Sequence, residues 1–443
     1  MAEKMLLGAN DRPKTGKWIA LSFQHVFAMF SATVLVPMLT GLPISVALFS
    51  SGIGTLIYIL CTKKKVPIYL GSSFAYITYI ISASTMVGGG IGAAMTGILV
   101  VGLIYMIVSL IIALVGSDWL NKLLPPVVVG PMIMVIGLGL ASTACQSAGL
   151  TVTSGALQDW RVIVVALATM FITACVSIKA KGFLKVIPFL IGICGGYILA
   201  VVLGFIPFQG YGALVDFSEL KEVILTPSKW FALPEFKILG WKDQELGAGI
   251  SMVKLNFAAA LNVIPLAFVT MCEHIGDHKV LGSITGEDYI KDPGLHRTLL
   301  GDGVATAFAA LIGGPANTSY GENTSVVGIT KIGSVWVTGL AAVIAVLLSF
   351  FNVFTTFIST IPGAVMGGVC LILYGFIASN GLKTLIDSKV DMTKTRNLII
   401  ISVMLVIGIG GATISYGIVT FSGMALAAIV GIILDKTLPR NEA

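Results

Sequence analysis

The chain has 443 residues, of which 56% are hydrophobic and only 11% are Asp, Glu, Lys or Arg. Because soluble domains are about one quarter charged, this composition excludes a soluble protein and predicts an all-α polytopic membrane protein. The net charge of +6 falls in short loops between apolar segments, where it directs membrane topology, so we expect no nucleic-acid partner.

Fourteen apolar segments follow one another along the chain, and each is predicted to cross or enter the lipid bilayer. Most Lys and Arg residues fall on the side of the N-terminus, which predicts a cell inner membrane protein with both termini in the cytoplasm. The segments are 18–40, 44–60, 67–84, 91–115, 123–144, 161–178, 184–206, 251–272, 302–314, 315–330, 333–351, 354–379, 397–414 and 416–434.

Short motifs recur in the two halves of the chain at a nearly constant offset of about 240–250 residues. Because each half has an odd number of segments, the two copies must lie in opposite orientations, which predicts two inverted repeats of seven segments. A substrate then sits at the midplane of the membrane, between interrupted helices. The pairs are Gln24-His25 with Glu273-His274, Pro67 with Pro315, and Pro125 with Pro362.

The third segment is one of the two interrupted ones. It begins PIYLGSSFAY at Pro67, which predicts an extended piece through Gly71 and then a half-helix from Ser72, Ser73 and Phe74. The tenth segment is its counterpart in the second repeat, so we expect the two half-helices to meet end to end from opposite leaflets.

The tenth segment, PANTSYGENTSVVGITK from Pro315 to Lys331, places an ionisable Glu322 between two apolar segments. We predict a short extended piece, about Ala316 to Tyr320, and a half-helix that begins near Gly321. Its free N–H groups suit the carbonyl oxygens of a small polar ligand, and Glu322 adds an acceptor. The alternative is a polar loop that only packs between helices.

The eighth segment ends in FVTMCEHIGDHK, in which Glu273 and Asp277 are four residues apart and share a helix face. Buried carboxylates that repel each other gain affinity for protons, so both residues are candidates for loading H⁺. His278 is a further candidate. The alternative places Asp277 and His278 at a solvated cytoplasmic helix end with a structural role.

Other polar residues carry weaker signals. Gln24 and His25 in the first segment are expected to form a buried hydrogen bond that locks helices together. Asp302 and Gly303, placed at the start of the ninth segment, receive no role. No metal, phosphate or dinucleotide motif and no nucleophile with a base appears, so we expect no cofactor and no enzyme.

These residues resemble the nucleobase–ascorbate transporter family, also called nucleobase:cation symporter-2, and within it the branch that carries uracil. The resemblance extends over essentially the whole chain. Ser325 departs from the Gly that is usual in the family signature. The motifs are ENTSVVGITK (322–331), LSFQHVFAMFSATVLVP (21–37), PIYLGSSFAYI (67–77), CEHIGDH (272–278), DPGLHR (292–297) and NTSYGEN (317–323).

The resemblance implies a domain layout and a homodimer. A core domain would comprise 1–115 and 251–351, a gate domain 116–206 and 352–443, and an extracellular loop 207–250. It also implies uptake of uracil together with a proton, by movement of one domain against the other.

The resemblance assigns site residues by position. Glu273 and Glu322 would hold the base, and Phe74 and Gly321 would supply backbone donors. Ala32, Tyr320 and Tyr374 would line the pocket, and Glu273, Asp277, Glu322 and His278 are the candidates for proton coupling.

Alternatives remain open at this stage. Glu322 favours uracil because xanthine and urate carriers typically have Gln there, whereas Asp277 is frequent in purine transporters, so a xanthine or other purine carrier is the first alternative. An anion transporter of the same architecture would need a cation or neutral residues in place of Glu273 and Glu322. A membrane enzyme or receptor finds no supporting motif.

Overall fold

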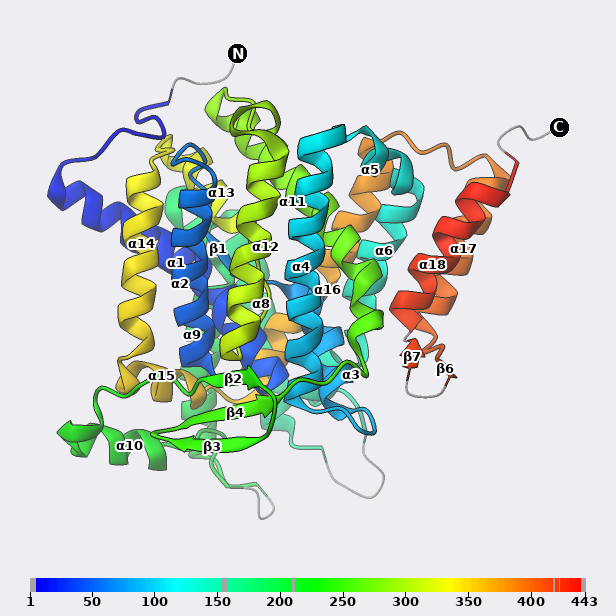
Figure 1. Ribbon diagram of the computed structural model, residues 1–443. Coiled ribbons are helices and arrows are strands. Elements are labelled where there is room, and N and C mark those ends of the chain that lie inside the picture. Colours follow the sequence, from blue (N-terminus) through cyan, green and yellow to red (C-terminus); the bar gives the residue numbers. More distant parts are fainter. Residues whose placement is uncertain (1–4, 153–157, 209–211, 417–418, 422, 440–443) are drawn as a thin grey trace.

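The computed structural model describes residues 5–152, 158–208, 212–416, 419–421 and 423–439. Most helices run roughly along one direction, and both ends of the described chain lie at the same end of the molecule (Figure 1). The opposite end is covered by α10 and by strands β2, β3 and β4. Among the described residues, six helices are long and apolar enough to span a bilayer when the adjoining helices of residues 126–147 are counted as one. The expected multi-pass helical architecture is therefore confirmed.

The helices are α1 Thr15–Thr40, α2 Ile44–Cys61, α3 Ile77–Thr85, α4 Ile91–Val115, α5 Asp118–Leu123, α6 Pro126–Leu138, α7 Ala141–Ser147, α8 Trp160–Lys179, α9 Pro188–Gly204, α10 Ser218–Leu225, α11 Ile264–Thr285, α12 Leu295–Ile312, α13 Gly321–Thr330, α14 Val335–Ser349, α15 Asn352–Ser359, α16 Gly363–Asp387, α17 Thr395–Ile409 and α18 Gly423–Thr437, with a short 3₁₀-helix η1 at Phe74–Tyr76. The strands are β1 Leu70–Ser72, β2 Lys237–Gly240, β3 Gln244–Gly247, β4 Ile250–Lys254, β5 Asn317–Ser319, β6 Ile414–Tyr416 and β7 Val419–Phe421.

Local sequence explains where several helices begin. Pro125 and Pro362 directly precede α6 and α16, and both are extended, with ψ angles of 155° and 154°. Proline cannot donate the hydrogen bond that a helix interior needs, so it is suited to this position. The two prolines that were paired as a repeat in the sequence therefore have the same structural role.

The expected all-α fold, with extended pieces in the third and tenth segments alone, was incomplete. Strands β2, β4 and β3 form a three-stranded sheet in the segment between α10 and α11, and β6 pairs with β7. Strands β2, β3 and β4 lie in the connection that precedes α11, whereas β6 and β7 fall at the junction of the predicted segments 397–414 and 416–434. In both places sheet pairing satisfies backbone groups that no helix covers. The pairing of β1 with β5, in contrast, joins the two extended pieces that the sequence predicted.

The eighth segment is displaced from its predicted bounds of 251–272. Residues 250–254 form β4, and helix α11 begins only at Ile264 and continues to Thr285. Likewise α12 begins at Leu295, ahead of the predicted 302. A hydropathy pattern ends a predicted span where polar residues begin. In α11 and α12, however, the buried polar residues His274, His278 and Asp302 face other helices.

Two predicted segments are also divided. The fifth, 123–144, is split between α6 and α7, and the twelfth, 354–379, between α15 and α16.

The helices pack in two groups. In the first, α12 packs against α4 and α2, and α14 packs against α2 and α1. In the second, α16 packs against α6, α8 and α9, and α17 packs against α18 and α6. Helix α11 contacts members of both groups.

Candidate functional site

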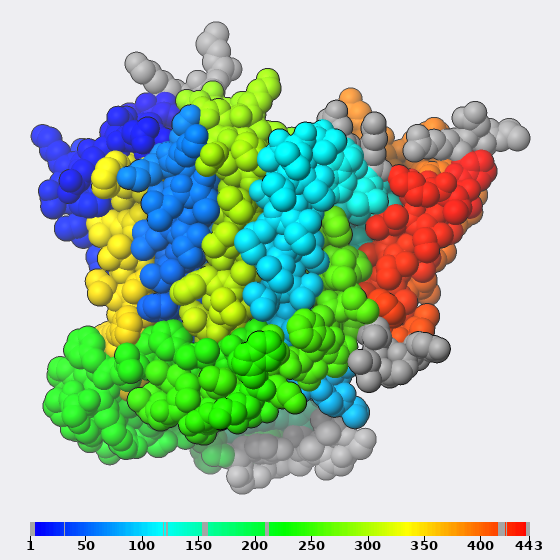
Figure 2. All heavy atoms as spheres, viewed as in Figure 1, coloured from blue at the N-terminus to red at the C-terminus, as the bar shows by residue number. Residues whose placement is uncertain are grey.

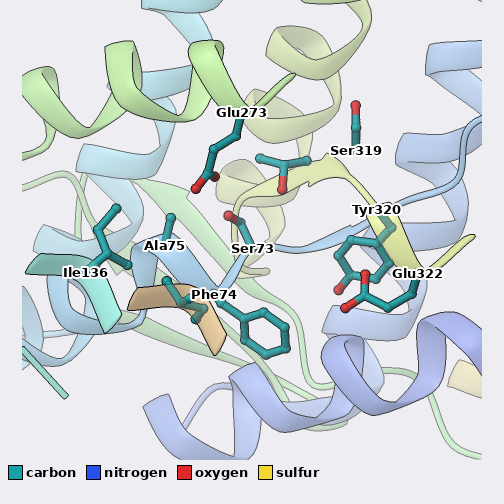
Figure 3. Close-up of a pocket in the computed structure, with 10 residues that line it drawn as sticks. Ser73, Phe74, Ala75, Ile136, Glu273, Ser319, Tyr320 and Glu322 are labelled. Carbon is teal, nitrogen blue, oxygen red and sulfur yellow. The ribbon is translucent and has the colours of Figure 1, made fainter. Parts of the chain in front are cut away.

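A pocket of about 120 Å³ lies where the two interrupted segments meet. It is small compared with the roughly 300–1,000 Å³ of pockets for drug-sized ligands. Glu273 and Glu322 approach it from different sides, with Ser73 and Phe74 between them (Figure 3). Its walls are formed by Ser73, Phe74, Ala75, Ile136, Glu273, Thr318, Ser319, Tyr320, Glu322 and Ile377.

The strand pair β1–β5 positions the pocket. The strands are antiparallel, with Gly71 opposite Thr318 and Ser72 opposite Asn317. Two further backbone bonds extend the ladder, because Ser73 N donates to Ala316 O at 2.9 Å and Tyr320 N donates to Tyr69 O at 3.1 Å. Since each strand leads directly into a helix, the ladder fixes both helix starts relative to each other.

Helix α13 begins at Gly321, as the sequence predicted, and its N-terminus has no side-chain cap. The first N–H that is bonded within the helix belongs to Thr324, which donates to Tyr320 O at 3.2 Å. The N–H groups of Gly321, Glu322 and Asn323 therefore have no partner from the helix ladder. These N–H groups can donate hydrogen bonds to acceptors such as the carbonyl oxygens of a ligand.

The second helix start is shifted slightly from its prediction. The expected half-helix from Ser72 begins two residues later, as η1 at Phe74, and it continues into α3. Ser73 is the N-terminal neighbour of η1, with no side-chain cap. Both interrupted segments thus present uncapped backbone donors at the pocket.

Two carboxylates complete the pocket. Among the described residues, Glu273 and Glu322 have no ion pair and no hydrogen bond with another side chain. An unpaired carboxylate inside a membrane protein is costly and by default marks a binding site or an ion pathway. Apart from a hydrogen bond between the Glu322 carboxylate and its own backbone N–H, their oxygens are available to accept hydrogen bonds from a ligand.

Tyr320 separates the strand pair from α1. Its hydroxyl donates to Ser72 O at 2.8 Å and lies 3.2 Å from Thr33 Oγ1. The ring packs directly on Gly71, where an added Cβ would lie 2.5 Å from the ring carbons. Only glycine at this position lets the ring lie against the strand.

The remaining predicted pocket residues lie close to the lining without forming it. Ala32 is buried in one hydrophobic cluster with Tyr320, against which Phe74 also packs. Tyr374 is buried in a second cluster that Phe74 also contacts. Asp277 lies one helical turn from Glu273, and its Oδ1 would lie 3.8 Å from a Cβ added at Gly321.

The alternative that placed His278 at a solvated helix end is wrong. Its side chain is fully buried in the middle of α11, and Nε2 lies 2.5 Å from the Tyr58 hydroxyl. Nδ1 donates to the His274 carbonyl at 2.7 Å. His278 is outside the pocket lining, and its contact with Tyr58 links α11 to α2.

Sequence analysis missed Asp302. The residue is fully buried on α12, and its Oδ2 lies 2.8 Å from His274 Nδ1. Ser319 of the pocket wall lies 3.3 Å from the same His274 nitrogen and donates to Asp302 at 3.4 Å. A carboxylate within an apolar segment was the available signal, but the segment was taken to begin at this residue, at the membrane surface.

The expected buried hydrogen bond of the first segment is present for His25. Asn323 Nδ2 lies 3.0 Å from His25 Nδ1 and 3.1 Å from its carbonyl oxygen, which ties α13 to α1. Gln24 Oε1, in contrast, is buried and has no hydrogen-bond partner in the part of the chain that the structure describes. Within the described ranges, no cluster of side chains could hold a metal ion.

Known proteins resemble this chain over nearly its whole length. Residues 16–417 match the sequence model of the Permease family. A uracil permease of Bacillus subtilis (strain 168) is 49% identical over 444 residues, with 99% of this chain and 97% of that protein covered. A uracil permease of Escherichia coli (strain K12) is 39% identical, with 96% and 92% covered.

Two solved structures share the fold at low sequence identity. The transmembrane domain of the cyanobacterial bicarbonate transporter BicA matches with a TM-score of 0.59 at 14% identity, covering 96% of this chain and 98% of that one. The murine anion transporter Slc26a9 in its inward-facing state matches with a TM-score of 0.65 at 14% identity, covering 96% of this chain and 68% of that one. This likeness concerns the fold alone.

The fold, the polar pocket between two helix starts and these relatives define a multi-pass membrane transporter and not an enzyme. More narrowly, the chain belongs to the nucleobase:cation symporter-2 family of permeases.

Proposed function

We propose that this protein carries uracil into the cell together with a proton, across the cytoplasmic membrane. The observation that supports it best is the pocket itself, in which two unpaired carboxylates and two uncapped helix starts converge. Uracil offers two N–H donors and two carbonyl acceptors on one small ring, which is the complementary pattern. The names of the relatives, at 49% and 39% identity, support the same substrate.

In this proposal Glu273 and Glu322 accept the N–H groups of uracil, and the N–H groups at Phe74 and Gly321 bind its carbonyl oxygens. Tyr320 holds the strand pair in place through its bond to Ser72. Charged acceptors make stronger hydrogen bonds than neutral ones, which favours tight binding of a neutral base.

Ala32 and Tyr374 form the apolar backing of the pocket, behind Phe74 and Tyr320. The Ala32 side chain has no polar group, and the only polar group of the Tyr374 side chain is its hydroxyl. Their role is to keep the pocket narrow.

The proton is carried by Glu273, Asp277 or Glu322. His278, on α11 one turn beyond His274, is a further candidate for the proton. A proton that enters with a neutral base moves one positive charge, so the membrane potential contributes about 2.3 kcal/mol per 100 mV to uptake. Uptake should then respond to the potential as well as to the pH gradient.

The transporter would have fourteen segments in two inverted repeats, both termini in the cytoplasm, and a core and a gate domain that move against each other in a homodimer. The two packing groups of helices support this division, because one contains α1, α2, α4, α12 and α14 and the other α6, α8, α9, α16, α17 and α18. The pocket is lined from both, since Ile136 and Ile377 belong to α6 and α16.

A xanthine or other purine carrier is the alternative, favoured by Asp277 one turn from Glu273. The small volume of the pocket argues against a two-ring base.

The test is uptake of radiolabelled uracil into proteoliposomes with an imposed inward proton gradient. We expect accumulation that a protonophore abolishes and that excess xanthine leaves unchanged. Uptake of xanthine without uracil would contradict the substrate, and accumulation of uracil that survives the protonophore would contradict the coupling.

A further inference from the structure

We propose that the protein has a specific binding site for one anionic phospholipid, in the groove between α2 and α14 on its outer surface. Phosphatidylglycerol represents this class of ligand. The two helices lie side by side on the face shown in Figure 2. The groove between them lies toward the end of the molecule where the chain begins, because Trp18 and Lys64 line it. The groove has a volume of about 460 Å³. It is lined by Trp18, Leu56, Ile59, Leu60, Lys64, Val335, Trp336, Gly339, Leu340 and Val343.

The wall of the groove is suited to an acyl chain. Apart from Lys64 at its rim, the lining consists of apolar and aromatic residues and one glycine. Leu60 is 68% exposed and Val343 40% exposed, so the groove is open along its length. Gly339 leaves space in its floor, because a Cβ added there would meet only Ile59, at 3.7 Å.

The rim of the groove is suited to a phosphate. Lys64 follows α2 and has no ion pair among the described residues, whereas its neighbour Lys65 is held by Asp292 at 2.6 Å. Arg12 lies over the Trp18 ring, with Cζ 4.3 Å from the ring centroid. Stacking orients a guanidinium and leaves its N–H groups available, and the described chain supplies no carboxylate for it.

Two tryptophans fix the geometry of this rim. Trp18 Nε1 donates to Trp336 O at 2.7 Å, and the two rings meet edge to face with centroids 6.5 Å apart. Tryptophan is enriched at the level of lipid headgroups, which is where a rim of this kind would lie. The groove therefore combines an apolar wall with one lining cation, Lys64, and a second cation, Arg12, stacked on the Trp18 ring that lines it.

The charge of the rim selects the class of lipid. No acidic side chain lines the groove, so the cationic part of a zwitterionic headgroup finds no partner. A net negative headgroup satisfies Lys64 and Arg12 without introducing a second positive charge. This selection does not depend on what the transporter carries.

Native mass spectrometry of the full-length protein, released from vesicles of equal phosphatidylglycerol and phosphatidylcholine, tests the site. We expect one phosphatidylglycerol to be retained in preference to phosphatidylcholine. Lys64→Gln should weaken this preference about fivefold, in line with the loss of one cation near a lipid surface. Gly339→Leu, which fills the floor without changing charge, should reduce retention of both lipids.

Lys63→Gln is the matched control. Lys63 and Lys64 are adjacent, both exposed, and both have left-handed backbone conformations with φ of 55° and 58°. Only Lys64 lines the groove. Equal loss of phosphatidylglycerol in the two variants, or equal retention of both lipids by the unmodified protein, would overturn the proposal. A dimer that Gly339→Leu dissociates would instead assign the groove to a second copy of the chain.

Discussion

The two pocket glutamates are the residues on which the proposed chemistry depends. They come from different helices, α11 and α13, and among the described residues neither carboxylate has a partner from another side chain. Glutamine keeps the length of the side chain and one acceptor oxygen but removes the charge. The substitution therefore separates the role of the charge from the role of shape.

Glu273→Gln and Glu322→Gln should each abolish proton-driven uracil uptake and weaken uracil binding about 10- to 100-fold, the value of a hydrogen bond to a charged group. Proteoliposome uptake and calorimetric titration with uracil measure the two effects. Glu245→Gln in the exposed strand β3 is the control. Normal accumulation by either pocket variant would remove that residue from the mechanism.

The buried pair of Asp302 and His274 is a second feature at this scale. Replacing Asp302 by Leu leaves the His274 nitrogen and the Ser319 hydroxyl without their carboxylate, so we expect unfolding to become easier by about 3–5 kcal/mol. Asp302→Asn, which keeps the shape, should cost less.

Thermal unfolding of the purified protein in detergent measures the effect of both Asp302 variants. Asp387→Asn is the control, because Asp387 is exposed at the end of α16. A melting temperature of Asp302→Leu that equals that of the control would refute a stabilising role for the pair.

At the scale of elements, the strand pair β1–β5 is the part of the structure that the site requires most. Gly71→Ala would place a methyl group 2.5 Å from the Tyr320 ring, so the ring must move away from Ser72 and Thr33. We expect a loss of stability of about 1–3 kcal/mol from overpacking, together with weaker uracil binding.

Gly363→Ala is the control for the Gly71 variant. Gly363 begins α16, and an added Cβ there would meet no atom within 4 Å. The two variants are compared by thermal unfolding and by uracil titration. Unchanged binding in Gly71→Ala would mean that the position of the Tyr320 ring does not shape the pocket.

Sequence reasoning located the helix start at Gly321 because polar and small residues between two apolar segments leave few other solutions in a membrane. It misplaced α11 and α12 because hydropathy cannot distinguish a polar residue that faces water from one that faces another helix. His278 and Asp302 are of the second kind, since their partners come from α2 and α11. Such contacts depend on the fold and are not visible in a local pattern.

At the scale of the whole molecule, both ends of the described chain lie on one face, opposite α10 and the β2–β4 sheet (Figure 1). An even number of crossings would produce this arrangement. Cysteines introduced at Asn10 and Lys436 should therefore react with an impermeant thiol reagent only in inside-out vesicles, and one at Glu245 only in right-side-out vesicles.

The labelling experiment requires a background in which the six native cysteines are replaced, so that only the introduced thiol can react. Uptake of uracil by the cysteine-free protein is the control that shows whether this protein still folds correctly. Labelling of Asn10 and Glu245 from the same side would contradict the proposed topology.

The ribbon of β1 and β5 also has a consequence for how the protein is made. Ser72 leaves the ribosome long before its partner Asn317. Leu70 can already bond to Ser51 and Thr55 of α2, but the edge of β1 that faces β5 obtains its hydrogen bonds only when β5 arrives. Unsatisfied backbone groups are costly in lipid, by several kcal/mol each. During synthesis the third segment must therefore wait in a hydrated or protein-lined environment, and the pocket is completed only after most of the chain has entered the membrane.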